Sequence, residues 1–310
     1  MTPHAADSAV ASTFSIVAAD PAAGQVGVAV QSKYLAVGAV VPWARAGVGA
    51  VATQALGLAR YGPDLLARLE AGSHPRDALL AALADDPLAR QRQVGVVRAD
   101  GQASTHTGDA CLDWAGGRAG EGFAAQGNIL TGPEVVDEMV RAYLAGPGGL
   151  AERLVASLEA GQAAGGDRRG QQSAAILVEQ AGYRDLGSEG IDKIFDLRVD
   201  DHPQPIAELR RVLGLRLRQE VSGRAMRYYN ARDFARAAEV MADGAGRFPD
   251  SPDILYNLAC FESLAGRAAD ALTHLRQAVA LDVSYRELAG RDTDFEPLRA
   301  SAEFQALLSP

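Results

Sequence analysis

Lysine is almost absent from this sequence. Of its 30 basic residues, 28 are Arg, and only Lys33 and Lys193 are Lys. Because the chain uses Arg wherever it merely needs a positive charge, a Lys at a given position is more informative than usual. Cysteine is equally scarce: Cys111 and Cys260 stand 149 positions apart, which argues against a disulfide framework and against a zinc site built on Cys. We expect both to be reduced, buried thiols.

Long apolar runs and basic runs are also missing. No segment reaches the 18 apolar residues that a membrane span requires, and no stretch of five or more Lys and Arg occurs. With 39 acidic and 30 basic residues the net charge is −9, so nucleic acid is not an expected partner. Residues 1–12 contain no Lys or Arg and no apolar run of the length that a secretory signal needs. These absences predict a cytoplasmic protein that does not enter membranes.

The composition that remains is that of a globular protein with room for two domains. Apolar residues make up 48% of the 310 positions and charged residues 22%, close to the average. Glycine changes along the chain: 28 of the 33 glycines lie in residues 1–218 and five in 219–310. We therefore expect a leader at 1–12, a domain at 13–218 and a helical domain at 219–310.

Alternating and apolar runs predict strands and helices in the first domain. The predicted strands are 13–19, 25–32, 39–44, 48–54, 93–98, 103–107, 122–126, 173–179 and 195–199. The predicted helices are 63–70, 75–83, 133–145, 149–160 and 205–217. Strand pairs separated by helix pairs favour antiparallel sheets with helices outside them. The predicted fold class is α+β, with a four-layer αββα sandwich (helix–sheet–sheet–helix) followed by an all-α domain.

The helical domain contains an internal repeat of 34 residues. The first copy includes Ala225 and Ala237, and the second has Ala259 and Ala271 at the matching positions. The remaining matched pairs are Tyr228 with Glu262, Phe234 with Ala268, Met241 with Leu275 and Pro249 with Val283. The 34-residue period and the small residues at the matching positions resemble those of tetratricopeptide repeats. Such repeats either form a groove for a partner peptide or serve packing and dimerisation, and both alternatives are open.

Two familiar signatures carry little weight. Residues 47–52 have the glycine spacing of a dinucleotide fold, but they lie between predicted strands instead of opening a helix. His106 and His202, the latter beside Asp200, could suggest a metal hydrolase. A metal site needs several converging ligands, whereas these histidines stand in unrelated loops. We therefore expect no metal and no cofactor.

Six segments carry a resemblance to a known family. They are TFSIVAADP (13–21), GVAVQSKYLAVGAVVPWARAGVGAVATQA (27–55), HTG (106–108), QGN (126–128), AGGDRRGQQSAAILV (164–178) and DLRVDDHPQPIAELRRVL (196–213). They resemble the bacterial and archaeal proteins catalogued as domain of unknown function 1028, which are related in fold to the N-terminal nucleophile hydrolases. The resemblance covers about residues 13–217 and leaves out the helical domain.

The resemblance implies a nucleophile at the start of the first strand, which is Thr13. In such a hydrolase the residue becomes the chain terminus, and its free α-amine, with a pKa near 7.7–8.0 in the reference state, acts as the base. A nearby ammonium would lower the pKa of that amine and stabilise the developing alkoxide. Lys33 ends the second strand, which returns toward Thr13. Alternatively, Lys33 is an ordinary lysine at the end of a strand, with no part in the chemistry.

Further residues are implied by analogy with this fold. Asp167 matches the position of a loop acid that orients the amine, although a turn-capping or salt-bridged aspartate is an equal alternative. Three amides, those of Gln54, Asn128 and Gln172, are candidates for substrate or oxyanion contacts. The pair Arg168 and Arg169 could bind a substrate carboxylate in a fork.

One departure from the family pattern affects the chemistry. Relatives commonly begin Met-Thr-Phe-Ser, whereas here twelve residues precede Thr13. With these residues attached, Thr13 has no free amine. Either the chain is cut before Thr13, translation begins nearer to it, or the site is silent.

The resemblance thus implies an amide-bond hydrolase of the N-terminal nucleophile type, with Thr13 as nucleophile, acting on a small peptide-like or acylated amine substrate. The alternative is a non-catalytic ligand-binding domain that presents the repeats to a protein partner. A homo-oligomer is compatible with either function.

Overall fold

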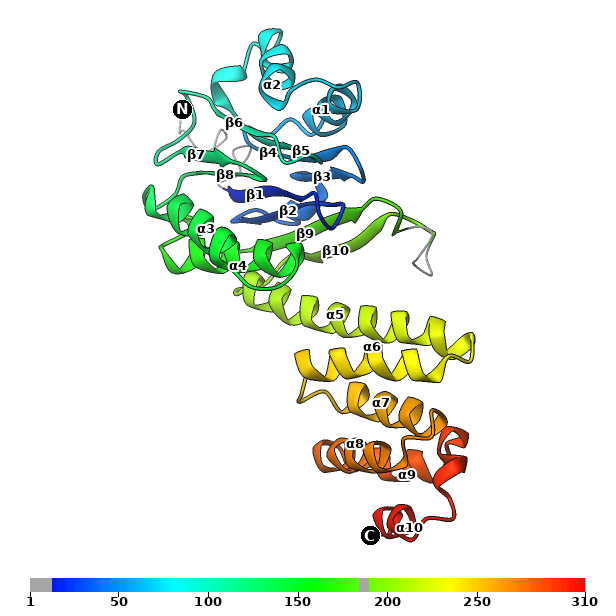
Figure 1. Cartoon of the computed structure of the whole chain (residues 1–310). Coiled ribbons are helices and arrows are strands. Elements are labelled where there is room, and N and C mark those ends of the chain that lie inside the picture. Colours follow the sequence, from blue (N-terminus) through cyan, green and yellow to red (C-terminus); the bar gives the residue numbers. More distant parts are fainter. Residues whose placement is uncertain (1–12, 184–189, 310) are drawn as a thin grey trace. The chain divides into compact units, whose positions relative to one another are not determined.

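The computed structural model describes residues 13–183 and 190–309 (Figure 1). The chain divides into two compact units between Leu213 and Gly214. The first unit is a mixed α+β structure with antiparallel sheets, and the second is helical, as the composition predicted. The division falls inside helix α5 (Pro205–Asn230), the helix that also contains the boundary expected near Arg218.

The larger sheet of the first unit has six antiparallel strands in the order β10-β9-β2-β1-β8-β7. Their bounds are β1 Thr13–Asp20, β2 Gln25–Ser32, β7 Gly116–Gly120, β8 Phe123–Asn128, β9 Ser173–Gln180 and β10 Lys193–Val199. The turn between β1 and β2 closes at Gly24, whose φ of 66° suits glycine. Strand β1 therefore lies inside the sheet, hydrogen-bonded to β2 and β8.

The smaller sheet packs against the larger one. Its order is β3 (Pro42–Arg45), β4 (Gly49–Ala55), β5 (Arg92–Arg98) and β6 (Ala103–Thr107). The shared core is built from small and β-branched side chains, from β1 and β2 on one side and from β4 and β5 on the other. Because these positions alternate along β1, β2, β4 and β5, one face of each of these four strands lies in the layer between the sheets.

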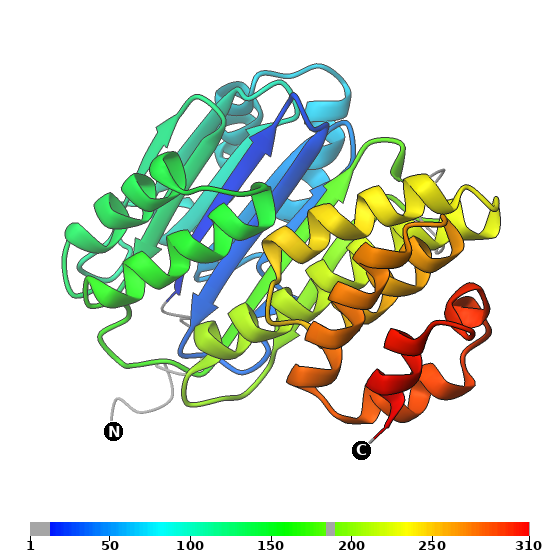
Figure 2. The ribbon, with the colours of Figure 1, turned by 60° about the horizontal axis from the view of Figure 1, so that its bottom comes forward.

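Helices cover the two outer faces. Helices α1 (Tyr61–Glu70) and α2 (Pro75–Ala84) bury leucines against the smaller sheet. Helices α3 (Glu134–Ala145) and α4 (Leu150–Ala163) lie across the larger sheet (Figure 2). A Cβ on Gly27 would lie 3.0 Å from a methyl of Leu154, so glycine is what allows α4 to approach β2 so closely.

A buried ion pair joins the end of α2 to the smaller sheet. Asp86 accepts hydrogen bonds from Arg92 Nε at 2.8 Å and Tyr61 Oη at 2.7 Å. The Asp86 and Arg92 side chains are only 9% and 8% exposed. The hydrogen bond from Arg92 is the main reason why the pKa of Asp86 falls to about 2.

This pair makes stability depend on pH. Because the pKa of Asp86 is depressed on folding, its stabilisation is present above the unfolded value near 3.8 and is lost as the pH falls toward 2. We expect Asp86→Asn to lower the free energy of unfolding by about 2 kcal/mol at pH 7 and by roughly half of that at pH 3. Urea unfolding at both pH values measures this. The exposed Asp109, paired with Arg90, offers the control: Asp109→Asn should change little. Equal losses for the two variants would contradict the prediction.

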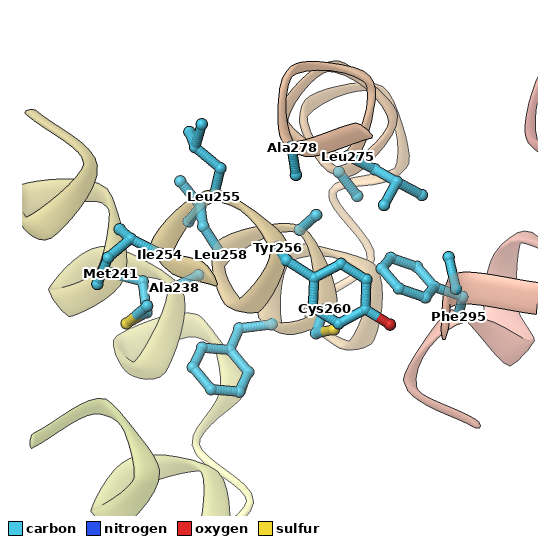
Figure 3. Packing of buried hydrophobic residues seen from close by; sticks show 14 of the residues in the cluster. Ala238, Met241, Ile254, Leu255, Tyr256, Leu258, Cys260, Leu275, Ala278 and Phe295 are labelled. Atoms are coloured by element: carbon cyan, nitrogen blue, oxygen red, sulfur yellow. The ribbon is translucent and has the colours of Figure 1, made fainter. Parts of the chain in front are cut away.

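The helical unit continues from α5 as a series of antiparallel neighbours. Its elements are α6 Phe234–Arg247, α7 Pro252–Leu264, α8 Ala268–Leu281, α9 Ser284–Arg291, the 3-10 helix η4 Thr293–Leu298 and α10 Ala302–Leu308. The two alanine pairs of the sequence repeat, Ala225 with Ala259 and Ala237 with Ala271, are fully buried. Figure 3 shows α7 packed between Met241 of α6 and Leu275 of α8. None of the described helices is both long and apolar enough to cross a membrane.

The structure corrects several sequence predictions. The strand predicted at 39–44 begins only at Pro42, as β3, and a short helical turn, Val37–Ala39, precedes it. The Ser173 hydroxyl accepts the main-chain N–H of Val37, and Ala36 has a φ of 52°, so the chain turns there. Strand β7 was not predicted because its sequence, GGRAG, has no β propensity. Helix α5 runs on to Asn230, well past the predicted end at Leu217.

Candidate functional site

A row of polar residues crosses the larger sheet where β1 begins. The register places Asn128 of β8 beside Thr13, Thr13 beside Ser32 of β2, and Ser32 beside Ser173 of β9. All four residues are fully buried. Two residues further along each strand, the same face carries Gln126, Ser15, Val30 and Ala175. The layer between the sheets is therefore apolar over most of its length and polar at the end where Thr13 lies.

The smaller sheet contributes a facing polar row. Gln54 of β4 pairs with Gln93 of β5, which pairs with Thr107 of β6. Gln54 Nε2 donates to Gln93 Oε1 at 2.8 Å, and Asn128 Nδ2 donates to the same oxygen at 3.0 Å. Gln93 Nε2 donates onward to the Gly127 carbonyl at 2.7 Å. These buried amides join the two sheets by hydrogen bonds instead of apolar contacts, which fixes their geometry.

Thr13 is held from both sides. Its hydroxyl donates to Ser32 Oγ at 3.0 Å. Its carbonyl oxygen accepts from Gln54 Nε2 at 3.1 Å and from Asn128 Nδ2 at 3.5 Å. The first residue of β1 is therefore ordered by the amide network, with its hydroxyl directed into the layer between the sheets.

The loop 167–172 crosses the sheet next to Thr13, and we call it the crossing loop. At one side the Arg168 N–H donates to the Ile129 carbonyl at 3.0 Å, directly after β8. At the other side the Gln172 N–H donates to the Ser32 carbonyl at 3.1 Å, at the end of β2. Because β1 lies between β8 and β2, the loop passes the starting end of β1.

The predicted loop acid fastens this loop. One Asp167 oxygen accepts the Lys33 main-chain N–H at 3.2 Å, and the other accepts the Arg169 N–H at 2.8 Å. The Arg169 guanidinium lies 3.6 Å from the latter oxygen, and the Asp167 side chain is completely buried. These are the contacts of a turn-capping, ion-paired aspartate. A role of Asp167 toward the amine of Thr13 stays a prediction.

Lys33 follows Ser32 directly, so its main chain lies one position from the residue opposite Thr13. Its side chain is exposed, and Nζ donates to the Gln171 carbonyl at 3.2 Å. The ammonium thus rests on the crossing loop. Its effect on the amine of Thr13 stays a prediction.

The candidates for substrate contact fall into two groups. Gln54 and Asn128 are buried and hydrogen-bonded to the carbonyl of Thr13, so they hold the main chain of Thr13 in place. Arg168 and Gln172 lie on the crossing loop with outward contacts. The Arg168 guanidinium donates to the Asp113 carbonyl at 3.2 Å, and Gln172 Nε2 donates to Asp201 Oδ1 at 3.2 Å.

Backbone strain gathers around these residues. Among the described residues, four other than glycine have positive φ, and three of them follow site elements. Ala55 (65°) comes directly after Gln54, Ile129 (53°) comes directly after Asn128, and Ala36 (52°) lies three residues beyond Lys33. A β-branched residue such as Ile129 is a clear outlier in this region. Such strain persists only where the surroundings fix it, which is typical of functional sites.

The two histidines of the metal alternative do not meet. The His106 ring contacts the Ala89 carbonyl at 3.2 Å, and His202 Nδ1 accepts the Gln204 N–H at 3.0 Å. Within the described ranges, the only group of three converging metal-ligand side chains is Cys260, Asp292 and Asp294 of the helical unit. Neither histidine belongs to it.

Cys260, Asp292 and Asp294 lie where the 3-10 helix η4 packs against α7 within the helical unit. The Tyr229 hydroxyl donates to Asp294 at 3.0 Å, and the Tyr256 hydroxyl donates to Asp292 at 2.8 Å. Figure 3 shows Phe295 beside Tyr256. This face of α7 is therefore covered by η4. A protein partner of the repeats stays a prediction, and it would have to use another face or displace η4.

Sequence reasoning missed Ser15, Ser32, Gln93 and Gln126. Each stands at the polar end of a strand whose inward positions further along are small or apolar. An inward polar residue in a buried strand is the signal that could have found them, since a buried amide or hydroxyl needs a partner.

Comparison with known proteins places the first unit. A sequence model of the family of unknown function DUF1028 matches residues 13–209. The crystal structure of protein SPO2555 from Silicibacter pomeroyi, described with the same family, shares 32% identity and a TM-score of 0.60. The similarity covers 66% of this chain and 85% of that one. No curated protein matches the chain. The resemblance read from the sequence is confirmed: this chain belongs to the family of unknown function DUF1028.

Proposed function

We propose that the protein is an amide-bond hydrolase of the N-terminal nucleophile type, with Thr13 as the nucleophile. The observation that carries the proposal is the placement of Thr13. It is the first residue of an inner strand, its hydroxyl faces the layer between the sheets, and its carbonyl is fixed by Gln54 and Asn128. The family match also begins at Thr13.

The proposed reaction uses the chain terminus as its base. In a chain that begins at Thr13, the α-amine takes the proton of the hydroxyl as Oγ1 forms a bond to the substrate carbonyl carbon. The amine then returns the proton to the departing nitrogen as the amide bond breaks. Water hydrolyses the resulting ester and regenerates Thr13. The substrate is a small peptide-like or acylated amine.

The proposed roles of the other residues follow from this step. The Lys33 ammonium lowers the pKa of the amine and stabilises negative charge near Oγ1. Asp167 orients the crossing loop and, through it, the terminus. Arg168 and Gln172 contact the substrate from that loop, while Gln54 and Asn128 hold the main chain of Thr13.

We propose that the first unit has the four-layer αββα sandwich of the N-terminal nucleophile hydrolases. Two facing antiparallel sheets, each covered by a helix pair, support this finer fold assignment. We also propose that the helical unit is tetratricopeptide-like, because the two alanine pairs of its 34-residue repeat are buried.

The alternative is a ligand-binding domain on the same fold without catalysis. It is favoured by the burial of Thr13 and by the engagement of both Asp167 oxygens with main-chain N–H groups. In that case Thr13 needs no free amine, and the hydrogen-bond network serves stability alone.

The N-terminus of the mature protein decides between these functions. Intact-mass analysis of protein from its native host should show a chain lighter by the mass of residues 1–12. A chain begun as Met-Thr13, from which methionine is removed, should hydrolyse members of a panel of acylated amines and dipeptides. A native chain that keeps residues 1–12, together with an inert Thr13 chain, would favour the binding domain.

A further inference from the structure

The Thr13 hydroxyl is hydrogen-bonded to another hydroxyl, that of Ser32. The two residues face each other in the β1–β2 register, and their oxygens lie 3.0 Å apart. Both residues are fully buried. No other part of the proposed mechanism uses Ser32.

Ser32 is itself held in place by the crossing loop. Its carbonyl accepts the Gln172 N–H at 3.1 Å, and the N–H of the next residue, Lys33, is bound by Asp167 at 3.2 Å. The next hydroxyl in the row, that of Ser173, is directed elsewhere, to the Tyr34 carbonyl at 2.5 Å. Ser32 is therefore a fixed point to which the Thr13 hydroxyl is bound.

We infer that Ser32 is a positioning residue for the Thr13 nucleophile, an inference that rests on the proposed function. Threonine has three staggered χ1 rotamers, and the hydrogen bond to Ser32 selects one of them. A hydroxyl both accepts and donates. Ser32 accepts from Thr13 in the resting state, and it donates to Oγ1 once the amine has taken the proton. Ser32 thus holds the attacking oxygen in one place through the step.

The test uses chains trimmed to Thr13, which retain every helix and strand of the described structure. A small β-lactone serves as the probe. When Oγ1 attacks its carbonyl carbon, the ring C–O bond breaks and the hydroxyl proton passes through the amine to the ring oxygen. The whole lactone stays attached as an ester, so intact mass gives the labelling rate. Its dependence on lactone concentration separates probe binding from the limiting rate.

Ser32→Ala should lower the limiting labelling rate by at least about tenfold and leave the half-saturating lactone concentration unchanged. Ser32→Thr, which keeps a hydroxyl, should restore most of the rate. The control is Ser157→Ala: Ser157 is an equally buried serine, in α4, bonded to the Met139 carbonyl. It should label like the wild type, although it also loses a buried hydrogen bond.

The outcomes separate this inference from the proposed function. If the wild type is labelled at Thr13 and Ser32→Ala is labelled equally fast, Ser32 has no positioning role. A loss that Ser32→Thr does not recover would also overturn the inference, because volume and not the hydroxyl would then matter. If a free Thr13 is not labelled at all, the proposed function itself fails, and the role of Ser32 fails with it.

Discussion

Thr13→Ala should reduce hydrolysis of any amide substrate by at least about a thousandfold in a chain that begins at residue 13. The hydroxyl is the only group proposed to form a bond to the substrate, so nothing replaces it. The amine and the surrounding amides remain. Initial rates on the most active substrate of the panel, for wild type and variant, measure the effect.

Two controls separate chemistry from folding. Thr13→Ala also removes the hydrogen bond to Ser32, which should cost about 1 kcal/mol of stability, too little to unfold the protein. Thr13→Ser keeps a hydroxyl on the terminal residue and should retain measurable activity. A Thr13→Ala chain as active as the wild type would exclude Thr13 as the nucleophile and leave the fold assignment unaffected.

The strands around this site were predictable because their sequences alternate or are continuously apolar. Strand β2 has the bounds that were predicted, and β1 differs by one residue. A short turn between them, residues 21–24, sets their pairing, so Ser32 and Lys33 return to Thr13 by local geometry alone. For this reason the position of Lys33 near the start of β1 could be anticipated without any knowledge of the sheets.

The contacts between the sheets could not be predicted in the same way. Gln54 and Thr13 are 41 positions apart, and Gln93 reaches Asn128 across 35 positions, so only the packing of two sheets brings them together. Sequence pattern identified Gln54 and Asn128 singly but not the network that joins them. The contacts of the crossing loop could not be predicted either, because Asp167 accepts the main-chain N–H of Lys33 over 134 positions. Main-chain contacts of this kind leave no trace in residue type at the donating end, here the N–H of Lys33.

The exposed side chain of Lys33 leads to the second large effect. Lys33→Ala should lower kcat/KM by at least about a hundredfold in a Thr13 chain, because the like-charged neighbour that lowers the pKa of the amine is gone. The base must be deprotonated to act. Without Lys33 the pKa of the amine rises toward its reference value of about 7.7–8.0, and the acid limb of the pH–rate profile moves to higher pH. The measurement is kcat/KM between pH 5 and 9.

The only other lysine of the chain is a matched control. Lys193 lies in strand β10, and its ammonium is paired with Asp196 at 2.9 Å. Lys193→Ala should leave both kcat/KM and the pH profile unchanged. Lys33→Arg should fail nearly as badly as Lys33→Ala, since a forked guanidinium does not replace a compact ammonium beside the terminus.

The contact that Lys33 makes in the structure sharpens this test. Its ammonium rests on the Gln171 carbonyl at 3.2 Å, an exposed hydrogen bond that contributes little to stability, so the side chain can turn toward Thr13 at small cost. If Lys33 only fastens the crossing loop, Lys33→Arg keeps a donor for Gln171 and restores activity, and the acid limb does not move. Full activity in Lys33→Arg would therefore remove Lys33 from the chemistry. Loss in both variants, with a shifted acid limb in Lys33→Ala, would place its charge beside the amine.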